Sequence, residues 1–469
     1  MKIFLTKTEG FKLSIDYNIL KDKKHIHFIG IGGSGMYPLA QILHAKGYNL
    51  SGSDNNSGDT LTAVMNMGIP VTLGHFKENV EGADLIVHSA AIMKDNPELV
   101  AAREKGIPTI ERSILLGIVT SWFNNAVCIC GTHGKTTTSS MLTQIYMQAN
   151  FDPTTVIGGK LELIGGSGRV GNSENMVCEA CEYVDTFLKL SPDVAVILNI
   201  DQDHMEYFKT LDNLIASFRK FSEMTTNKIV VNGDDENSMK AVSGLDKCVV
   251  TFGLDKKNDY YAENIASEVC HASHSLVTSF DLFKKGEFLG NISFKIPGKH
   301  NVYNALAACS AALETGVCFE DVKSAMEAFK SASRRFDVLG IKNGVTIADD
   351  YAHHPAELEA TLNAALSLGF NKVWAVFQPF TFSRTAMLLD DFAKVLSLAD
   401  RVVLTPIMGS REINTYGIDS KDLMDKLENC VLLDTFEQVA DYIAKNAQKD
   451  DLVITLGCGD IYKAAKLMI

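Results

Sequence analysis

Residues 127–138 read VCICGTHGKTTT, and this stretch determines how the rest of the chain is interpreted. The apolar residues before Gly131 predict a buried strand, and the apolar pattern after Thr138 predicts a helix. A glycine-rich turn between a strand and a helix gathers backbone N–H groups at one point, where they bind phosphate. The predicted phosphate site comprises Gly131, Thr132, His133, Gly134, Lys135, Thr136 and Thr137.

Lys135 and Thr136 carry the chemistry of this loop. A lysine at this position reaches the outer phosphates of a nucleotide such as ATP, and the threonine after it places a hydroxyl on Mg²⁺. The common form, GxxxxGK[ST], has a glycine where this chain has Ile129, so the loop here is a tighter G-T-x-G-K-T. The alternative interpretation is a lysine on an exposed turn.

Bulk properties limit the class of protein. The chain has 469 residues and a formal net charge of −13, which argues against a nucleic-acid partner. No apolar run approaches the roughly 20 residues that span a bilayer, so no membrane partner is expected. The cysteines lie mostly in apolar runs, which indicates a reducing, cytoplasmic location. A single C-x-x-C, formed by Cys178 and Cys181, is weak support for zinc.

A second glycine-rich turn follows the first predicted strand, at HIHFIGIGGSGM. The pattern G-x-G-x-x-G between a strand and a helix, with an acid roughly 20 residues later, is typical of diphosphate binding. A UDP-sugar presents the same diphosphate as NAD, so the pattern alone does not choose between them. The residues concerned are Gly30, Gly32, Gly33, Ser34, Gly35, Asp54 and the strand-end Ser89.

Polar residues follow two buried strands of the middle region. Glu179 and Glu182 follow one strand, and His204 lies in the segment Asp-Gln-Asp-His after the next. Carboxylates at strand ends beside a phosphate loop suit Mg²⁺, which prefers oxygen ligands. In isolation, a solvated turn or a structural histidine explains the same residues. The proximity expected to Lys135 favours the metal site.

Gly158-Gly159 and residues 164–171 are glycine-rich and predict a mobile loop, and residues 248–297 predict short antiparallel strands. A helix then begins near Asn301, and Asn304 lies three positions later on the same helical face. Amide side chains carry both a donor and an acceptor, which suits the edge of adenine. Helix capping is an equal alternative for either asparagine.

Alternation of strands and helices resumes in the last third of the chain, which predicts a further α/β unit. We therefore predict an α/β protein of three domains. Residues 1–118 form a Rossmann-like, UDP-sugar-binding domain. Residues 119–331 form a central P-loop ATPase-like domain that carries a small antiparallel β appendage. Residues 332–469 form a C-terminal Rossmann-like ligase domain.

Several segments together resemble the Mur ligases of peptidoglycan synthesis. They are HIHFIGIGGSGM, GTHGKTTT, NIDQDHMEYF, GKHNVYNALAA, RRFDVLG, DDYAHHP and GCGDIYKAA. The resemblance implies ATP-dependent ligation of L-alanine to UDP-N-acetylmuramate through an acyl phosphate, by a monomer or a weak homodimer. It also implies that Lys135, Glu179, His204 and Arg335 are catalytic, that Thr136, Glu179 and His204 bind metal, and that Asn301, Asn304, Arg335 and Asp350 bind ATP.

Two positions depart from the family pattern. Many members have an aspartate where this chain has Cys181, and many have a histidine where it has Phe380. The remaining candidates for binding the L-alanine carboxylate are His353, His354 and Arg384.

Three other functions are open at this point. A sister ligase joins a whole peptide to the same nucleotide sugar. An NAD-dependent oxidoreductase would use the first glycine turn but would leave Lys135 unexplained. A non-catalytic regulator would bind ATP without turnover.

Overall fold

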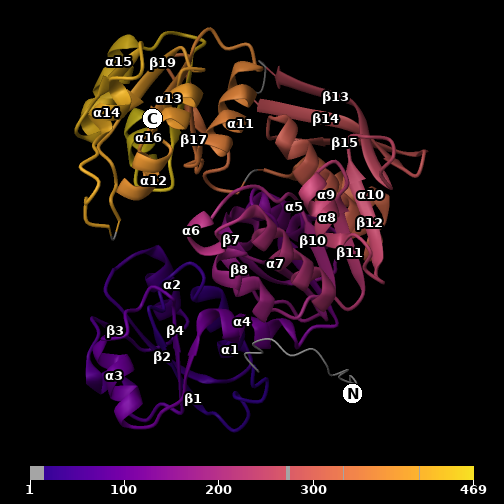
Figure 1. The fold of residues 1–469 in the computed structure, drawn as a ribbon, viewed down its shortest axis with the longest axis vertical. Helices are drawn as coiled ribbons and strands as arrows, with labels where there is room; N and C mark the ends of the chain where they lie inside the picture. Colours follow the sequence, from indigo (N-terminus) through magenta and orange to yellow (C-terminus); the bar gives the residue numbers. More distant parts are fainter. Residues whose placement is uncertain (1–14, 271–274, 331, 411) are drawn as a thin grey trace.

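A computed structural model describes residues 15–270, 275–330, 332–410 and 412–469. The chain builds three β-sheets in sequence order, each flanked by helices. Figure 1 shows the corresponding lobes, with the N-terminal lobe in indigo at one end and the C-terminal lobe in yellow and orange at the other. This confirms the three-part α/β fold expected from the sequence.

The N-terminal sheet has five parallel strands in the order β3-β2-β1-β4-β5. Strand β1 is central and its apolar residues are fully buried, because helices cover both faces of a doubly wound sheet. The elements are β1 (His25–Ile29), α1 (Tyr37–Ala45), β2 (Asn49–Asp54), α2 (Asp59–Asn66), β3 (Val71–Leu73), η1 (Lys77–Val80), β4 (Leu85–His88), α3 (Pro97–Glu104), β5 (Thr109–Glu111) and α4 (Arg112–Thr120).

The central sheet has ten strands in the order β15-β14-β13-β12-β11-β10-β6-β9-β7-β8. Its elements are β6 (Asn125–Cys130), α5 (Lys135–Gln148), β7 (Thr154–Leu161), η2 (Glu162–Ile164), β8 (Gly166–Arg169), β9 (Asn175–Glu179), η3 (Tyr183–Lys189), β10 (Val194–Ile197), α6 (Met205–Phe208), α7 (Leu211–Met224), β11 (Lys228–Asn232), α8 (Glu236–Val242), β12 (Cys248–Gly253), β13 (Tyr260–Cys270), β14 (Ser275–Lys284), β15 (Glu287–Phe294), α9 (Lys299–Glu314) and α10 (Phe319–Ala328).

The predicted antiparallel strands are present as β13, β14 and β15, and they continue the central sheet at one edge. Strand β12 differs from the expectation, because it pairs in parallel with β11. The structure also differs from the prediction of a mobile loop in the glycine-rich stretch. Most of it forms β7 and β8, which pair antiparallel at the opposite edge of the sheet.

The C-terminal sheet has six strands in the order β16-β17-β21-β18-β19-β20, and only β16 is antiparallel to its neighbour. Its elements are β16 (Asp337–Lys342), β17 (Val345–Asp350), α11 (Pro355–Leu366), β18 (Val373–Phe377), α12 (Phe382–Met387), α13 (Leu389–Leu396), β19 (Arg401–Leu404), α14 (Ser420–Met424), β20 (Cys430–Leu432), α15 (Phe436–Asn446), β21 (Leu452–Leu456) and α16 (Tyr462–Met468).

The predicted domain limits stay predictions. The limit at 118/119 falls within α4, and the limit at 331/332 falls between α10 and β16. Residues 1–14, 271–274, 331 and 411 lie outside the described residues. Within the described ranges, no helix combines the length and the apolar character needed to cross a membrane.

Candidate active site

The loop after β6 has the geometry of an anion cradle. Gly131 and Gly134 have φ angles of 144° and 87°, and a side chain at Gly134 would collide with Asn304 Oδ1 at 2.2 Å. Helix α5 begins immediately after Gly134, so its first backbone N–H groups face the loop without partners inside the helix. Asn199 holds the loop in place, since its side chain accepts the N–H of His133 at 2.8 Å and donates to the carbonyl of His133 at 3.1 Å.

The Lys135 ammonium lies inside this cradle. It donates to the carbonyl oxygen of Gly131 at 2.6 Å and to both carboxylate oxygens of Glu182, at 3.0 and 2.9 Å. Glu182 is almost completely buried. Burial alone would lower the pKa of Lys135, but the facing carboxylate of Glu182 outweighs it and raises that pKa. The lysine therefore remains a cation in a largely desolvated site.

Thr136 and Glu179 form the adjacent pair. The Thr136 hydroxyl donates to Glu179 Oε2 at 2.9 Å, and the Gly158 N–H on β7 donates to the same oxygen at 2.8 Å. Two hard oxygen groups beside a phosphate cradle fit Mg²⁺, which takes one or two protein ligands and completes its shell with phosphate and water. Within the described ranges, no cluster of three His, Cys, Asp or Glu side chains could hold a metal ion.

His204 approaches the same region from the loop after β10. It has a left-handed backbone with φ of 56°, and its ring packs 4.5 Å from that of Tyr183. Its two nitrogens lie 3.6 Å from Asp203 and 3.5 Å from Glu206. The ring is thus held by neighbours on both sides, at the edge of the cavity described next.

A cavity of about 170 Å³ brings together all of the predicted catalytic and amino-acid-binding residues. It lies between the central and C-terminal domains, and the phosphate loop forms one of its walls. The lining residues are Thr132, His133, Gly134, Lys135, Thr136, Glu179, Asp203, His204, Arg335, His353, His354, Glu357 and Arg384. We call it the phosphate cavity.

The two histidines of the C-terminal domain differ in their hydrogen bonds. His353 Nδ1 lies 3.1 Å from the carbonyl oxygen of Tyr351, so it donates its hydrogen there, and burial lowers the pKa of the ring. His354 is the N-cap of α11, and its Nδ1 accepts the N–H of Ala356 at 3.4 Å. His353 therefore leaves Nε2 for another partner, whereas His354 already has a structural role.

Glu357 joins the phosphate loop to the C-terminal domain. Its Oε1 lies 3.6 Å from His133 Nδ1, and its Oε2 accepts the N–H of His353 at 3.1 Å. Burial favours the neutral acid, but His353 and His133 outweigh it and hold the pKa of Glu357 well below its usual value. The anion is the form that links the two domains.

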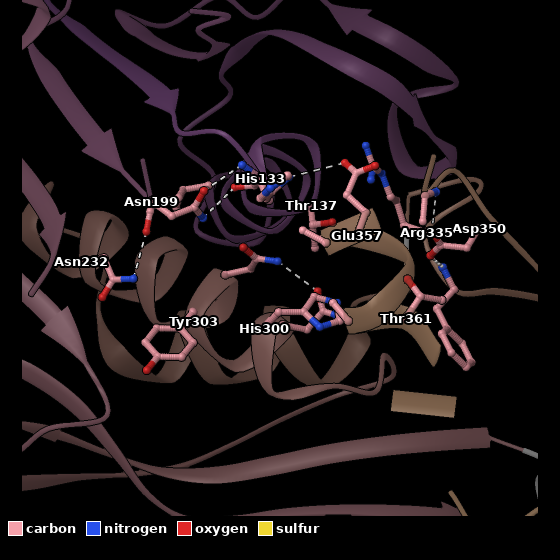
Figure 2. A pocket seen from close by; sticks show the side chains of 18 of the residues that line it. His133, Thr137, Asn199, Asn232, His300, Tyr303, Arg335, Asp350, Glu357 and Thr361 are labelled. Atoms are coloured by element: carbon pink, nitrogen blue, oxygen red, sulfur yellow. Dashed lines mark hydrogen bonds and ion pairs between the residues drawn. The ribbon is translucent and has the colours of Figure 1, made fainter. Parts of the chain in front are cut away.

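A second cavity, of about 310 Å³, adjoins the phosphate cavity and contains Asn301 and Asn304. Figure 2 shows His133 and Asn199 on one side of it and Arg335 and Asp350 on the other. Asn304 Nδ2 donates to Asn301 Oδ1 at 3.0 Å, and Asn301 Nδ2 donates to the carbonyl of Pro297 at 2.7 Å. Gly298 is the N-cap of α9, so neither asparagine caps the helix as the alternative had proposed.

Asp350 and Arg335 form the far wall of this second cavity. The Asp350 carboxylate accepts backbone N–H groups of Phe336 and Ala352, both at 2.7 Å. Burial raises the pKa of Asp350 to about 6, against the opposing effect of Arg335. Arg335 itself lines both cavities and stacks 5.3 Å from the ring of Tyr351.

A third cavity, of about 340 Å³, lies between the N-terminal and central sheets. Four of the predicted nucleotide-sugar residues line it, namely Gly33, Ser34, Gly35 and Ser89, and so does Glu179. Gly30, Gly32 and Asp54 are absent from its lining. The Asp54 carboxylate instead accepts the Gly32 N–H at 2.9 Å, so it stabilises the turn from behind.

The sequence interpretation missed three lining or supporting residues. The sequence places Glu182 among the acids at a strand end but does not assign it to Lys135. Its position three residues after Glu179 is the one signal for such a role. Arg112 lines the third cavity directly beside Gly35, where a side chain on Gly35 would meet its guanidinium at 3.0 Å. Glu357 follows the HHP segment, and nothing in the sequence pointed to it.

These features define a three-domain α/β enzyme with an anion cradle beside a cavity between its central and C-terminal domains. The chain belongs to the Mur ligase family. Three family models match successive segments of the chain. They are "Mur ligase family, catalytic domain" at residues 25–123, "Mur ligase middle domain" at 129–312 and "Mur ligase, glutamate ligase domain" at 334–459.

The chain is also similar to individual members of the family. The UDP-N-acetylmuramate–L-alanine ligase of Caldanaerobacter subterraneus is 42% identical over 453 residues, which are 95% of this chain and 97% of the relative. The solved UDP-N-acetylmuramate–alanine ligase of Thermotoga maritima superposes with a TM-score of 0.81 at 28% identity, covering 95% of this chain and 98% of that one. A murein peptide ligase from Psychrobacter arcticus shares the fold, with a TM-score of 0.72 at 23% identity, over 95% and 98% of the two chains.

Proposed function

We propose that this enzyme ligates L-alanine to the lactyl carboxylate of UDP-N-acetylmuramate at the expense of ATP, in peptidoglycan synthesis. The observation that carries the proposal is the position of Glu179, which lines both the third cavity and the phosphate cavity. A nucleotide sugar in the third cavity and an ATP γ-phosphate beside Lys135 would therefore meet at one carboxylate. That meeting point is what acyl-phosphate formation requires.

The first step joins two anions. A carboxylate oxygen of the sugar nucleotide attacks the γ-phosphorus, the bond to the β-phosphate oxygen breaks, and ADP leaves. Lys135 and Arg335 offset the charge that develops on the transferred group, which is how most phosphoryl transfers are accelerated. In this proposal ATP binds with its adenine beside Asn301 and Asn304 and its phosphates on the loop from Gly131 to Thr137.

The lysine must first leave its present partner. Lys135 pairs with Glu182 in the structure, so we infer that incoming phosphates compete with that carboxylate for the ammonium. Thr136 and Glu179, with His204 at the edge, would hold Mg²⁺. The ion would supply further neutralisation of the phosphate charge.

The second step is amine attack on the acyl phosphate. The amine nitrogen of L-alanine bonds to the carbonyl carbon, inorganic phosphate leaves, and the nitrogen loses a proton. Arg384 offers the cation for the L-alanine carboxylate, and His353 Nε2 offers a neutral acceptor for the proton, since its Nδ1 hydrogen is donated to Tyr351. We assign His354 mainly to capping α11.

The remaining parts of the proposal concern the sugar-nucleotide site and the form of the protein. Gly33, Ser34, Gly35, Ser89 and Arg112 line the cavity that we assign to the diphosphate and sugar. Gly30, Gly32 and Asp54 support that turn. A cytoplasmic monomer or weak homodimer, without nucleic-acid or membrane partners, remains the expected form.

Phosphate release with UDP-N-acetylmuramate and ATP, measured with each amino acid in turn, tests the proposal. We expect release with L-alanine that exceeds release with a tripeptide. Preference for the tripeptide would identify the enzyme as a peptide-adding sister ligase. Absence of release with every acceptor would contradict the ligase assignment.

A further inference from the structure

A fully buried carboxylate, Glu98 on α3, lies behind the glycine turn of the N-terminal domain and outside the lining of the three cavities described above. Its Oε2 accepts the Ser53 hydroxyl at 2.7 Å and lies 3.3 Å from His75 Nδ1 and 3.8 Å from His27 Nε2. Asn79 donates its amide to Oε1. A buried charge is costly unless polar partners surround it, and Glu98 has such partners.

Hydrogen-bond donors surround Glu98. The single hydrogen of the Ser53 hydroxyl goes to Glu98, so the 3.0 Å contact between Ser53 and His75 Nδ1 requires the imidazole to donate. Burial would raise the pKa of Glu98, but His27, Asn79 and Ser53 outweigh it and lower that pKa. The carboxylate is therefore an anion that accepts hydrogen bonds from Ser53 and Asn79 and lies beside the His75 and His27 imidazoles.

Ser53 connects this cluster to the glycine turn. Its backbone carbonyl accepts the N–H of Gly30 at 2.8 Å and that of Ile31 at 3.1 Å. The next residue, Asp54, accepts the N–H of Gly32 through its side chain at 2.9 Å. The end of β2 thus holds three successive N–H groups of the turn, and Glu98 fixes the side chain of the residue that holds two of them.

We propose that Glu98 is a positioning residue for nucleotide-sugar binding: through Ser53, it holds the turn whose outer residues, Gly33 to Gly35, line the third cavity. This inference rests on the proposed function, because it takes that cavity as the site of a UDP-sugar. Glu98 has no role in phosphoryl transfer in this account. Its loss should therefore change the affinity for one substrate and leave the chemical step intact.

Two variants test the link between Glu98 and Ser53, one at each residue. Glu98→Gln replaces an acceptor-only group by one that also donates, so either Ser53 or Asn79 must lose its acceptor. Ser53→Ala removes only the hydroxyl link, is small, and leaves the backbone carbonyl in place. We expect each variant to raise the KM for UDP-N-acetylmuramate by roughly tenfold, with kcat and the KM for ATP within about twofold of the wild type.

The double variant provides the sharper criterion. If both residues act through one link, Glu98→Gln combined with Ser53→Ala raises KM little more than either alone. Asp84→Asn is the matched control. Asp84 accepts the backbone N–H groups of Lys24 and His25 at the opposite end of β1, so its loss should lower the melting temperature without changing KM.

The outcomes distinguish a positioning role of Glu98 from a contribution to stability alone. If Glu98→Gln and Ser53→Ala behave as Asp84→Asn does, with lower melting temperatures and unchanged KM, the positioning role is wrong. If Glu98→Gln does not fold, Ser53→Ala alone decides by the same criterion. Calorimetric titration with UDP-N-acetylmuramate measures the same affinity loss without turnover, so a failure of the proposed ligation is distinguishable from a failure of this inference.

Discussion

At the scale of single residues, the two acids after β9 have different roles although they lie three positions apart. Glu179 accepts from Thr136 and Gly158 and faces two cavities, whereas Glu182 is buried against Lys135. The sequence predicted a carboxylate group at this strand end. It could not assign the two roles, because they depend on how η3 turns after Cys181, where Val184 and Asp185 have left-handed φ angles.

Lys135→Ala should reduce ATP-dependent ligation by about 10²- to 10³-fold, because it removes a preorganised cation from a desolvated site. Phosphate release under saturating substrates measures the effect. Lys240→Ala, on the exposed side of α8, is the control and should retain full activity. Near-normal ligation by Lys135→Ala would contradict the role of the phosphate loop.

Glu182→Gln should change the pH dependence of the reaction. Burial lowers the pKa of Lys135 and the Glu182 carboxylate raises it, so removal of the carboxylate should lower that pKa. The ammonium would then lose its proton at a lower pH, and the alkaline limb of kcat/KM for ATP should move in the same direction. Rate profiles from pH 7 to 10 check this, and superimposable profiles for the variant and wild type would refute it.

Asp350 should make the enzyme less stable as the pH rises. Its pKa is raised from 3.8 to about 6, so the folded state favours the protonated acid. This contribution is fully present below about pH 4 and is lost as the pH rises through 6, with a magnitude of roughly 3 kcal/mol. The melting temperature of the wild type relative to Asp350→Asn should therefore fall between pH 4 and 7. A difference that stays constant over this range would show that Asp350 does not titrate as described.

At the scale of secondary-structure elements, the β7–β8 hairpin shows where sequence interpretation failed. Glycine-rich residues usually indicate loops, and this stretch was predicted as one. The glycines instead allow a strand to approach the site closely. A side chain at Gly158 would lie 2.4 Å from Glu179 Oε1, and one at Gly159 would lie 2.8 Å from Thr136 Cγ2. The reason for these glycines is a tertiary contact, which local sequence does not encode.

Gly158→Ala should accordingly impair catalysis without unfolding the hairpin. The new methyl group displaces Glu179 from Thr136, so we expect at least a tenfold loss of ligation and a higher Mg²⁺ requirement. Gly166→Ala in the same hairpin is the matched control, since its added carbon would meet only Tyr37, at 3.5 Å. Equal activity in the two variants would mean that the strand does not position Glu179.

Elements with strong local signals were predicted well. The strand, glycine turn and helix around Lys135 and the parallel strands of the N-terminal sheet follow from apolar runs that end in turn residues. Residues whose position depends on packing between domains were not found. Arg112 and Glu357 are examples, because each reaches a cavity formed with another domain.

At the scale of the whole molecule, the three cavities adjoin one another through shared lining residues. Glu179 is shared by the third cavity and the phosphate cavity, while Arg335 and Glu357 are shared by the phosphate cavity and the second cavity. Each of the three domains thus contributes residues to these cavities, and the proposed reaction requires groups from all three. Binding energy spent in bringing the domains together would then contribute to the rate of the chemical step.

The most direct test of this account follows an oxygen atom through the reaction. UDP-N-acetylmuramate labelled with ¹⁸O in its lactyl carboxylate is incubated with the enzyme, ATP and L-alanine, and the released phosphate is analysed by mass spectrometry. The account predicts one ¹⁸O atom in each phosphate, because a carboxylate oxygen bonds to the γ-phosphorus and leaves with it. Phosphate without ¹⁸O would contradict acyl-phosphate formation at the junction of these cavities.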